Sequence, residues 1–195
     1  MLSLGISSTI HRNKSIMAYL TKFKHTGSVI SSSNQFGAKM FAVAAGFFQQ
    51  YVRGVFVGTG SGVVAQYFIQ ANIPFVYVEK HPAFVRQFHE RFGAHTPLLA
   101  KDFFTLPLDD SSGGLANCLI VSCMPVTGPF YSERLVEQFR DALNSGSTIV
   151  QMSYTPFVRQ VRLFERLQKE GFLIERKGSV LMNIPPASVF VLRKS

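Results

Sequence analysis

The glycine-rich stretch from Gly54 to Gly62 constrains the fold more than any other part of the sequence. Three β-formers, Val55 to Val57, lead into Gly58, Gly60 and Gly62 at alternate positions, and the apolar segment 63–69 follows with helical potential. Glycines suit a tight turn because they tolerate positive φ and let backbone N–H groups approach a ligand closely. The stretch therefore predicts a strand, a tight turn and a helix.

A second apolar run, Pro74 to Val78, ends in the acidic residue Glu79. A carboxylate at the tip of the next parallel strand is well placed to bind both hydroxyls of a ribose. Taken singly, a glycine repeat is often only a loop, and an acidic residue after a strand is often a solvated cap. Their order along the chain favours a nucleoside-containing cofactor at the carboxyl ends of these two strands.

The glycine spacing also discriminates between cofactors. The dinucleotide fingerprint has a later glycine near the pyrophosphate, where this chain has Val64 or Ala65. A nucleoside without a pyrophosphate, such as S-adenosylmethionine, therefore fits better than NAD. We include Thr59, inside the glycine turn, and Lys80, beside Glu79, among the candidate cofactor-binding residues.

Two later strand ends are predicted to lie at the same edge of the sheet. A short strand over 96–100 precedes Asp102, whose carboxylate is a candidate acceptor for an adenine amino group, with Phe103 packing on the ring; the alternative is a surface-loop acid. The apolar run 118–122 is typical of a buried parallel strand and ends before Pro125, which cannot continue a central strand. The loop after it faces the reacting centre in a doubly wound sheet.

The rest of the chain alternates between helical and extended patterns. Further helices are predicted from a cap at Ser32 or Ser33 to before Arg53, and over 82–92, 131–143 and 157–169; further strands over 148–154, 172–175 and 180–192, the last around a Pro-Pro turn. This alternation, ending in a strand pair, predicts an α/β protein with a three-layer α/β/α sandwich and a mainly parallel, seven-stranded sheet whose last strand is antiparallel.

Positive charge is concentrated in the first part of the chain. The formal net charge is +9, and no Asp or Glu precedes Glu79. This balance favours an anionic partner, either nucleic acid or a membrane surface. We interpret residues 1–25 as a basic amphipathic helix and residues 26–195 as the main domain. The helix is either an ordinary packed first helix or an interfacial membrane-binding one.

The cysteines, acidic loop and hydropathy bear on compartment and metal binding. Cys118 and Cys123 are the only cysteines, which fits reduced, buried thiols in a cytoplasmic protein. Asp109 and Asp110 have no further ligands nearby, so we expect no metal. No apolar run approaches the ~20 residues needed to cross a bilayer. We therefore expect a cytoplasmic protein, peripheral on the inner face of the membrane.

Four further motifs join the glycine turn in a resemblance that covers nearly the whole chain. They are Thr26–Val29 with Ser32 and Ser33, Ser122–Pro125, Gln151–Tyr154 and the closing segment Asn183–Ala187. With Glu79 and Asp102, the chain resembles class I S-adenosylmethionine-dependent methyltransferases. More narrowly, it is similar to the bacterial phospholipid N-methyltransferases, which are relatives of the ribosomal RNA adenine dimethyltransferases.

The resemblance implies an enzyme that transfers methyl groups from S-adenosylmethionine to the amine of phosphatidylethanolamine or its methylated derivatives at a membrane surface. For the reacting centre we hypothesise Tyr154 as a polar or aromatic group, with a role in the core as the alternative, and Ser122, which is also a candidate cofactor contact. One position departs from the family pattern, because Phe56 stands where an acidic residue is usual.

Two alternatives to the phospholipid interpretation remain open. One is an RNA adenine N-methyltransferase, which suits the positive charge. Against nucleic acid as a partner, those relatives have an Asn-x-Pro-aromatic loop, to which Ser122–Val126 does not conform, and an added helical domain. The other is a catalytically degenerate membrane-binding module, suggested by Phe56.

Overall fold

The structure is a computed structural model that describes residues 34–183 and 185–195. The predicted basic helix in 1–25, the turn at 26–29 and the caps Ser32 and Ser33 lie outside these residues. The described strands are β1 (Gly54–Val57), β2 (Phe75–Val78), β3 (Leu98–Leu99), β4 (Leu119–Ser122), β5 (Thr148–Ser153), β6 (Phe172–Val180) and β7 (Ala187–Lys194). The described helices are α2 (Asn34–Ala45), α3 (Ala65–Gln70), α4 (Pro82–Phe92), α5 (Glu133–Asn144) and α6 (Arg162–Lys169), with 3-10 turns η1 (Phe103–Thr105), η2 (Gly128–Phe130) and η3 (Val158–Gln160).

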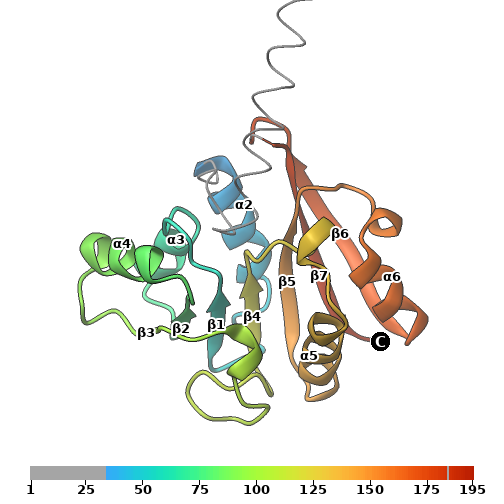
Figure 1. Cartoon of the computed structure of the whole chain (residues 1–195), viewed down its shortest axis with the longest axis horizontal. Coiled ribbons are helices and arrows are strands. Elements are labelled where there is room, and N and C mark those ends of the chain that lie inside the picture. Colours follow the sequence, from blue (N-terminus) through green and yellow to red (C-terminus); the bar gives the residue numbers. More distant parts are fainter. Residues whose placement is uncertain (1–33, 184) are drawn as a thin grey trace, which may run out of the picture. The chain divides into compact units, whose positions relative to one another are not determined.

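The strands form one mixed sheet in the order β3-β2-β1-β4-β5-β7-β6 (Figure 1). Strands β1 to β5 are parallel, and β7 pairs antiparallel with both β5 and β6. The predicted α/β class, mainly parallel sheet and antiparallel last strand are confirmed. The strand order reverses between β1 and β4, and in such sheets ligands bind outside the carboxyl ends at this switch point.

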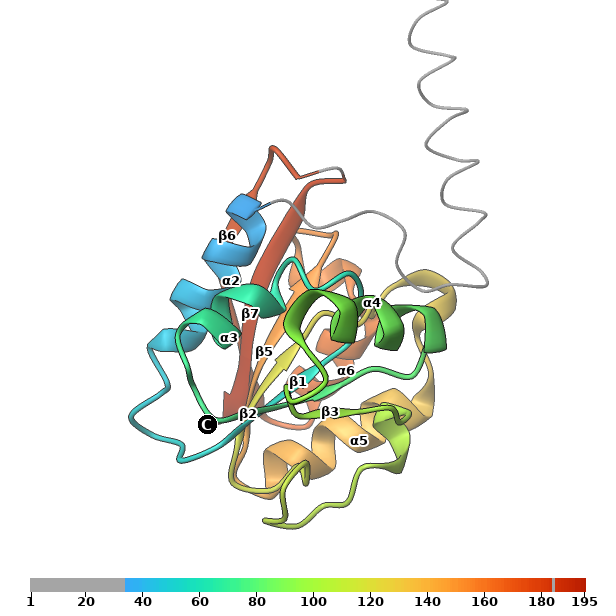
Figure 2. The ribbon, with the colours of Figure 1, turned by 90° about the vertical axis from the view of Figure 1, so that its left-hand side faces the viewer.

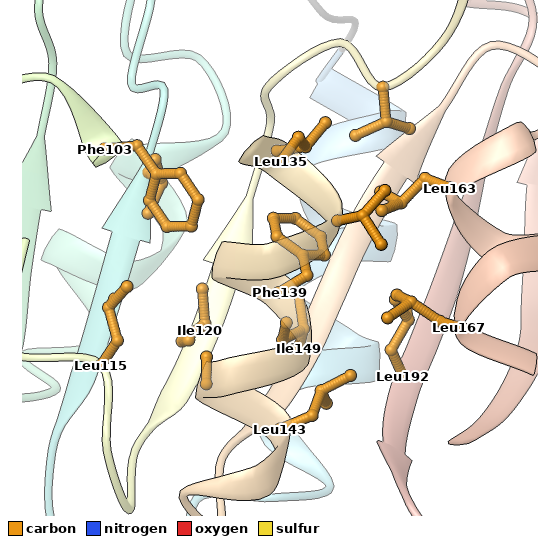
Figure 3. Packing of buried hydrophobic residues seen from close by; sticks show 14 of the residues in the cluster. Phe103, Leu115, Ile120, Leu135, Phe139, Leu143, Ile149, Leu163, Leu167 and Leu192 are labelled. Atoms are coloured by element: carbon orange, nitrogen blue, oxygen red, sulfur yellow. The ribbon is translucent and has the colours of Figure 1, made fainter. Parts of the chain in front are cut away.

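Helices cover both faces of the sheet, and the two buried layers differ in composition. Between the sheet and α5 and α6 lies a core in which aliphatic side chains outnumber five phenylalanines, which we call the aliphatic core. In it, Phe139 and Leu143 of α5 pack over Ile149 and Leu192 (Figure 3). The opposite face carries an aromatic core, built from β1 and β2 against α2, α3 and α4. This three-layer arrangement is also visible in the turned view (Figure 2).

Several helices and strands begin or end at residues other than those predicted from the sequence. The helix expected over 131–143 begins at Glu133, because the Ser132 Oγ accepts a hydrogen bond from the Leu135 N–H at 3.2 Å and caps it. The helix expected over 157–169 was wrong in its first residues: η3 and an extended Val161, at φ −109° and ψ 100°, come before α6. The third strand is two residues long rather than five.

Candidate functional site

The turn after β1 adopts a backbone that requires glycine. Gly58, Gly60 and Gly62 have φ values of 74°, 51° and 79°, in the left-handed region. A Cβ at Gly58 would lie 3.2 Å from the Met124 backbone nitrogen, and one at Gly62 would lie 2.5 Å from the ring of Phe92. The turn is therefore packed between the loop after β4 and the end of α4.

Glu79 joins this turn to the end of β2. Its Oε2 accepts a hydrogen bond from the Gly60 N–H at 3.0 Å, and its Oε1 accepts one from the His81 N–H at 2.9 Å. The residue is 8% exposed. A carboxylate offers about four acceptor positions, so two backbone donors leave capacity for the hydroxyls of a ligand.

Two buried polar atoms, in residues at or next to the backbone donors of this carboxylate, have no hydrogen-bond partner among the described residues. They are the Thr59 Oγ1 and the His81 Nδ1. An unsatisfied buried polar group costs about 1–3 kcal/mol, so a ligand that supplies partners would regain that energy. Thr59 is among the residues predicted from the sequence. His81 was not predicted, although its place two residues after Glu79 was an available signal.

Asp102, Lys80 and Phe103 follow the neighbouring strands but differ in their surroundings. The Asp102 Oδ1 accepts from the Phe104 N–H at 3.1 Å, and its Oδ2 lies 3.4 Å from the Lys80 Nζ. The Asp102 and Lys80 side chains are both partly exposed at the carboxyl edge. The Phe103 ring is buried in the aliphatic core and contacts the Phe139 ring edge-on, with centroids 5.8 Å apart. Phe103 therefore contributes packing in this structure.

Ser122 is the last residue of the central strand β4, at the carboxyl edge of the sheet, in register with Val57 on β1 and Gln151 on β5. It is fully buried, and its Oγ accepts from the Met124 N–H at 3.4 Å. The Gln151 Nε2 also holds this loop, donating to the Met124 carbonyl at 2.8 Å, while its Oε1 has no partner among the described residues. The sequence analysis named Gln151 only as part of a motif. A glutamine inside an apolar strand was nevertheless a signal that its side chain hydrogen-bonds to a neighbouring loop.

Tyr154 follows β5 and packs, with Cys123, against the aromatic core. Burial raises the pKa of Tyr154 to about 12, and the nearby Cys123 contributes to this rise. Burial likewise raises the pKa of Cys123 to about 12. An acid–base catalyst works best with a pKa near the working pH, so the neutral phenol is suited to hydrogen bonding and to ring contacts rather than to proton abstraction as a phenolate.

Phe56 points to the aromatic core and is fully buried. Its ring centroid lies 5.3 Å from that of Phe68 and 5.8 Å from that of Tyr77. An apolar cluster thus occupies the environment of the position where the resembling family carries an acid. The free energy of this packing gives Phe56 a structural role whatever ligand the site takes.

Residues 34–183 and 185–195 contain no group of three or more His, Cys, Asp or Glu side chains that could hold a metal ion. The Asp109 carboxylate instead accepts from the backbone N–H and hydroxyl of Ser111, which lowers the pKa of Asp109. Within the same residues, every helix is too short or too polar to cross a bilayer.

No protein-family model matches the sequence, and no curated protein matches it. Among solved structures, the chain is similar to the 23S rRNA methyltransferase ErmE, at 14% identity over 86% of this chain and 70% of that one, with a TM-score of 0.61. It is similar to a putative RNA methyltransferase, PH1948 from Pyrococcus horikoshii, at 15% identity over 100% and 98% of the two chains and a TM-score of 0.62. Magnesium protoporphyrin IX methyltransferase from Synechocystis PCC 6803, crystallised with bound SAM, gives 13% identity over 100% of both chains and a TM-score of 0.58.

These likenesses are likenesses of fold. The chain has the fold of class I S-adenosylmethionine-dependent methyltransferases, as its resemblance to that class predicted. In this fold the loops that carry Gly58–Gly62, Glu79, Ser122 and Tyr154 belong to one edge of the sheet, where the parallel strands end.

Proposed function

We propose that this protein is an S-adenosylmethionine-dependent N-methyltransferase that acts on the amine of phosphatidylethanolamine or its methylated derivatives. The observation that carries the proposal is the contact between the end of β2 and the glycine turn. There the Glu79 carboxylate binds the Gly60 N–H, beside the unpartnered Thr59 hydroxyl. A buried acid with acceptor capacity next to glycine backbone suits a nucleoside with free ribose hydroxyls.

The residues present fit S-adenosylmethionine. The glycines at positions 58, 60 and 62 place no side chain over the turn backbone, and the Thr59 Oγ1 lacks a partner among the described residues that a ligand could provide. The cofactor, when bound, supplies an electrophilic methyl group. The proposed binding residues are Gly58, Thr59, Gly60, Gly62, Glu79, Lys80, Asp102, Phe103 and Ser122, with Phe103 contributing through the backbone and packing of its loop.

The chain's own contribution to methyl transfer is positioning. Alignment of reacting groups can supply up to roughly 7–11 kcal/mol of a barrier. The amine would react as the neutral base, after releasing one proton to solvent, and the methyl group would pass from the sulfonium sulfur to its nitrogen. Tyr154 would accept a hydrogen bond from this amine or present its ring face to the cationic headgroup. Ser122 would fix the loop after β4, since its Oγ accepts from the Met124 N–H at 3.4 Å. No covalent enzyme intermediate is required.

Charge supports a lipid substrate. The net charge of +9 and the absence of acids before Glu79 favour an anionic surface as partner. In this proposal the protein binds reversibly to the inner face of a membrane, with the basic segment 1–25 as one contact. The loop Ser122–Val126 lacks the Asn-x-Pro-aromatic pattern of the adenine dimethyltransferases, which argues for an amine other than adenine.

A second candidate, RNA adenine N-methylation, is favoured by a specific observation. Two of the similar structures are an rRNA methyltransferase and a putative RNA methyltransferase, and the same positive charge would contact phosphates. The third possibility, a catalytically degenerate module, is motivated by Phe56 and predicts no cofactor binding at all.

One set of measurements separates the three. Isothermal titration with S-adenosylhomocysteine tests cofactor binding, and radiolabelled methyl donor is offered in parallel to phosphatidylethanolamine vesicles and to RNA. We expect binding, and label in the lipid only. The Glu79→Gln variant is the negative control, because its amide nitrogen would face a backbone N–H donor. Label in RNA alone would replace the phospholipid proposal, and a folded protein without binding heat would support the degenerate module.

A further inference from the structure

The tip of the β6–β7 hairpin exposes two adjacent apolar side chains. Leu181 is 77% exposed and Met182 is 76% exposed. Exposed apolar residues that stand singly are ordinary on protein surfaces. Leu181 and Met182 are instead adjacent and lie on a projecting turn. We call these two exposed apolar residues the hairpin tip.

The hairpin tip lies at the functional edge of the sheet. Ser188 on β7 pairs with Ser153, the last residue of β5, and Ala187 pairs with Val180 on β6. The turn between β6 and β7 therefore projects beyond the carboxyl end of β5, where Tyr154 follows (Figures 1 and 2). Val180 and Tyr154 also pack against the same aromatic core. A surface that receives the tip would consequently lie at the same edge of the sheet as Tyr154.

Polar contacts within the hairpin hold this turn in shape. The Asn183 Nδ2 donates to the Pro185 carbonyl at 2.7 Å, and Asn183 itself is buried. The hydroxyls of Ser179 and Ser188 hydrogen-bond across the two strands at 2.7 Å. These hydrogen bonds restrain the turn that carries the two apolar side chains. A restrained turn loses less conformational entropy when its side chains insert into a binding partner.

Positive charge surrounds the base of the hairpin. The Lys39 side chain from α2 packs over Gly178, where an added Cβ would lie 2.7 Å from its Cε. Arg176 and Lys177 stand on β6, and Lys177 pairs with Glu175 at 3.1 Å. Lys39 forms no ion pair within the described residues, so the base of the hairpin carries an excess of positive charge.

Apolar side chains at the hairpin tip, with positively charged side chains at the base of the hairpin, suit the interface of a bilayer. The apolar groups enter the headgroup and acyl boundary, while Lys and Arg stay with anionic headgroups. Single-stranded nucleic acid would instead favour aromatic side chains on which bases stack. Leu181 and Met182 offer no such ring.

We propose that the hairpin tip inserts into the interfacial region of an anionic lipid bilayer, with Lys39, Arg176 and Lys177 contacting the headgroups. This inference rests on the proposed phospholipid methylation, because it explains how a headgroup amine reaches the edge that carries Tyr154. It adds a docking surface within the folded domain to the contact proposed for residues 1–25.

The test uses the full chain and its lack of tryptophan. Because the sequence has no Trp, the Met182→Trp variant carries a single fluorescent reporter at the tip. Val52, 90% exposed and preceding the amino end of β1, is the matched control as Val52→Trp. On adding vesicles of phosphatidylglycerol and phosphatidylethanolamine, we expect a blue shift of the fluorescence of Met182→Trp and none for Val52→Trp.

The loss-of-function arm replaces the two side chains by serine. The Leu181→Ser/Met182→Ser variant should sediment with these vesicles at least about tenfold more weakly, because two partly inserted apolar side chains are lost, whereas Val52→Ser should bind within about twofold of wild type. Lys39→Gln should weaken binding by about fivefold, and added salt should reduce that difference.

The outcomes separate docking from catalysis. Unshifted fluorescence of the Met182→Trp variant with vesicles that do bind the protein would overturn the inference, as would a shift caused by RNA, by protein concentration alone, or already present without lipid. The double serine variant should still methylate phosphatidylethanolamine dispersed in detergent micelles. Absence of methylation by wild type on every substrate, with the vesicle-induced shift intact, would remove the proposed reaction while leaving the docking surface in place.

Discussion

The two edges of the sheet satisfy their polar groups in opposite ways. At the amino edge, where β1, β4 and β5 begin, side chains bind a series of backbone carbonyls. At the carboxyl edge, the Thr59 Oγ1, the His81 Nδ1 and the Gln151 Oε1 are buried without a partner among the described residues. A fourth such atom, the Tyr77 hydroxyl oxygen, belongs to the aromatic core. Since a native protein pairs nearly all buried polar atoms, the contrast supports the proposal that a ligand binds at the carboxyl edge.

Arg53 is the centre of the amino edge. Its guanidinium donates to the carbonyls of Gly114, at 2.6 Å, and Asp109, at 3.1 Å, and also to that of Ala116. It lies 3.5 Å from an Asp110 carboxylate oxygen. These bonds fasten the loop 109–117 to the start of β1. The acidic loop is thus tied to a cation of the protein itself.

Ser147 and Tyr51 form further hydrogen bonds at the amino edge. The Ser147 Oγ donates to the Leu115 carbonyl at 2.7 Å and accepts from the Cys118 N–H at 3.0 Å. The Tyr51 hydroxyl lies 2.8 Å from the Thr148 Oγ1 and donates to the Gly146 carbonyl at 3.1 Å. Polar side chains at the amino edge thus stabilise the fold through hydrogen bonds, whereas several polar atoms at the carboxyl edge have no partner within the described protein.

The comparison predicts its largest effect at Arg53. The Arg53→Met substitution should lower the free energy of unfolding by about 3 kcal/mol, because it leaves the part-buried carbonyls of Gly114 and Ala116 without their charged donor. The affinity of the folded protein for S-adenosylhomocysteine should stay within about twofold, since the loss lies at the other edge. Urea unfolding and isothermal titration measure the two quantities. A fall in affinity with unchanged stability would break the division between the edges.

Thr59 should show the reverse behaviour. In Thr59→Val a methyl group replaces the unpartnered hydroxyl, so the free energy of unfolding of the ligand-free protein should rise by about 1 kcal/mol. The affinity for S-adenosylhomocysteine should fall by about tenfold, because the ligand loses a hydrogen-bond partner. Thermal unfolding without and with ligand reads both changes in one experiment. Equal changes in both states would show that the hydroxyl does not contact the ligand.

Sequence reasoning reached the fold through patterns that depend on neighbouring residues. The glycine turn, the apolar strands and the Pro-Pro turn are local, so the layer order followed from their sequence. Contacts between segments far apart in the sequence could not be predicted in this way. The bond from the Gln151 Nε2 to the Met124 carbonyl joins residues 27 positions apart, and the burial of Phe103 depends on Phe139 of α5. The roles of Glu79 and Tyr154 as ligand contacts stay predictions.

The smallest expected effect tests whether surface charge at the amino edge matters. Arg140 and Glu170 form a bidentate pair, with Nε to Oε2 at 2.6 Å and Nη2 to Oε1 at 3.1 Å. The hydrogen bonds from Arg140 lower the pKa of Glu170 below its ordinary value. A carboxyl whose pKa is lower in the folded state stabilises the protein above its unfolded pKa, near 4.3, and that contribution disappears as pH falls through the folded pKa.

Arg140→Met should therefore reduce the free energy of unfolding at pH 7 by less than about 1 kcal/mol, since the pair is about 30% exposed and solvent screens it. The difference between variant and wild type should vanish on acidification below the folded pKa of Glu170, because both forms then carry a neutral carboxyl. Urea unfolding between pH 7 and the acid limit measures this convergence. A difference that persists in acid would assign the effect to apolar packing of the side chain at position 140 instead of to the ion pair, since apolar contacts do not depend on the protonation of Glu170.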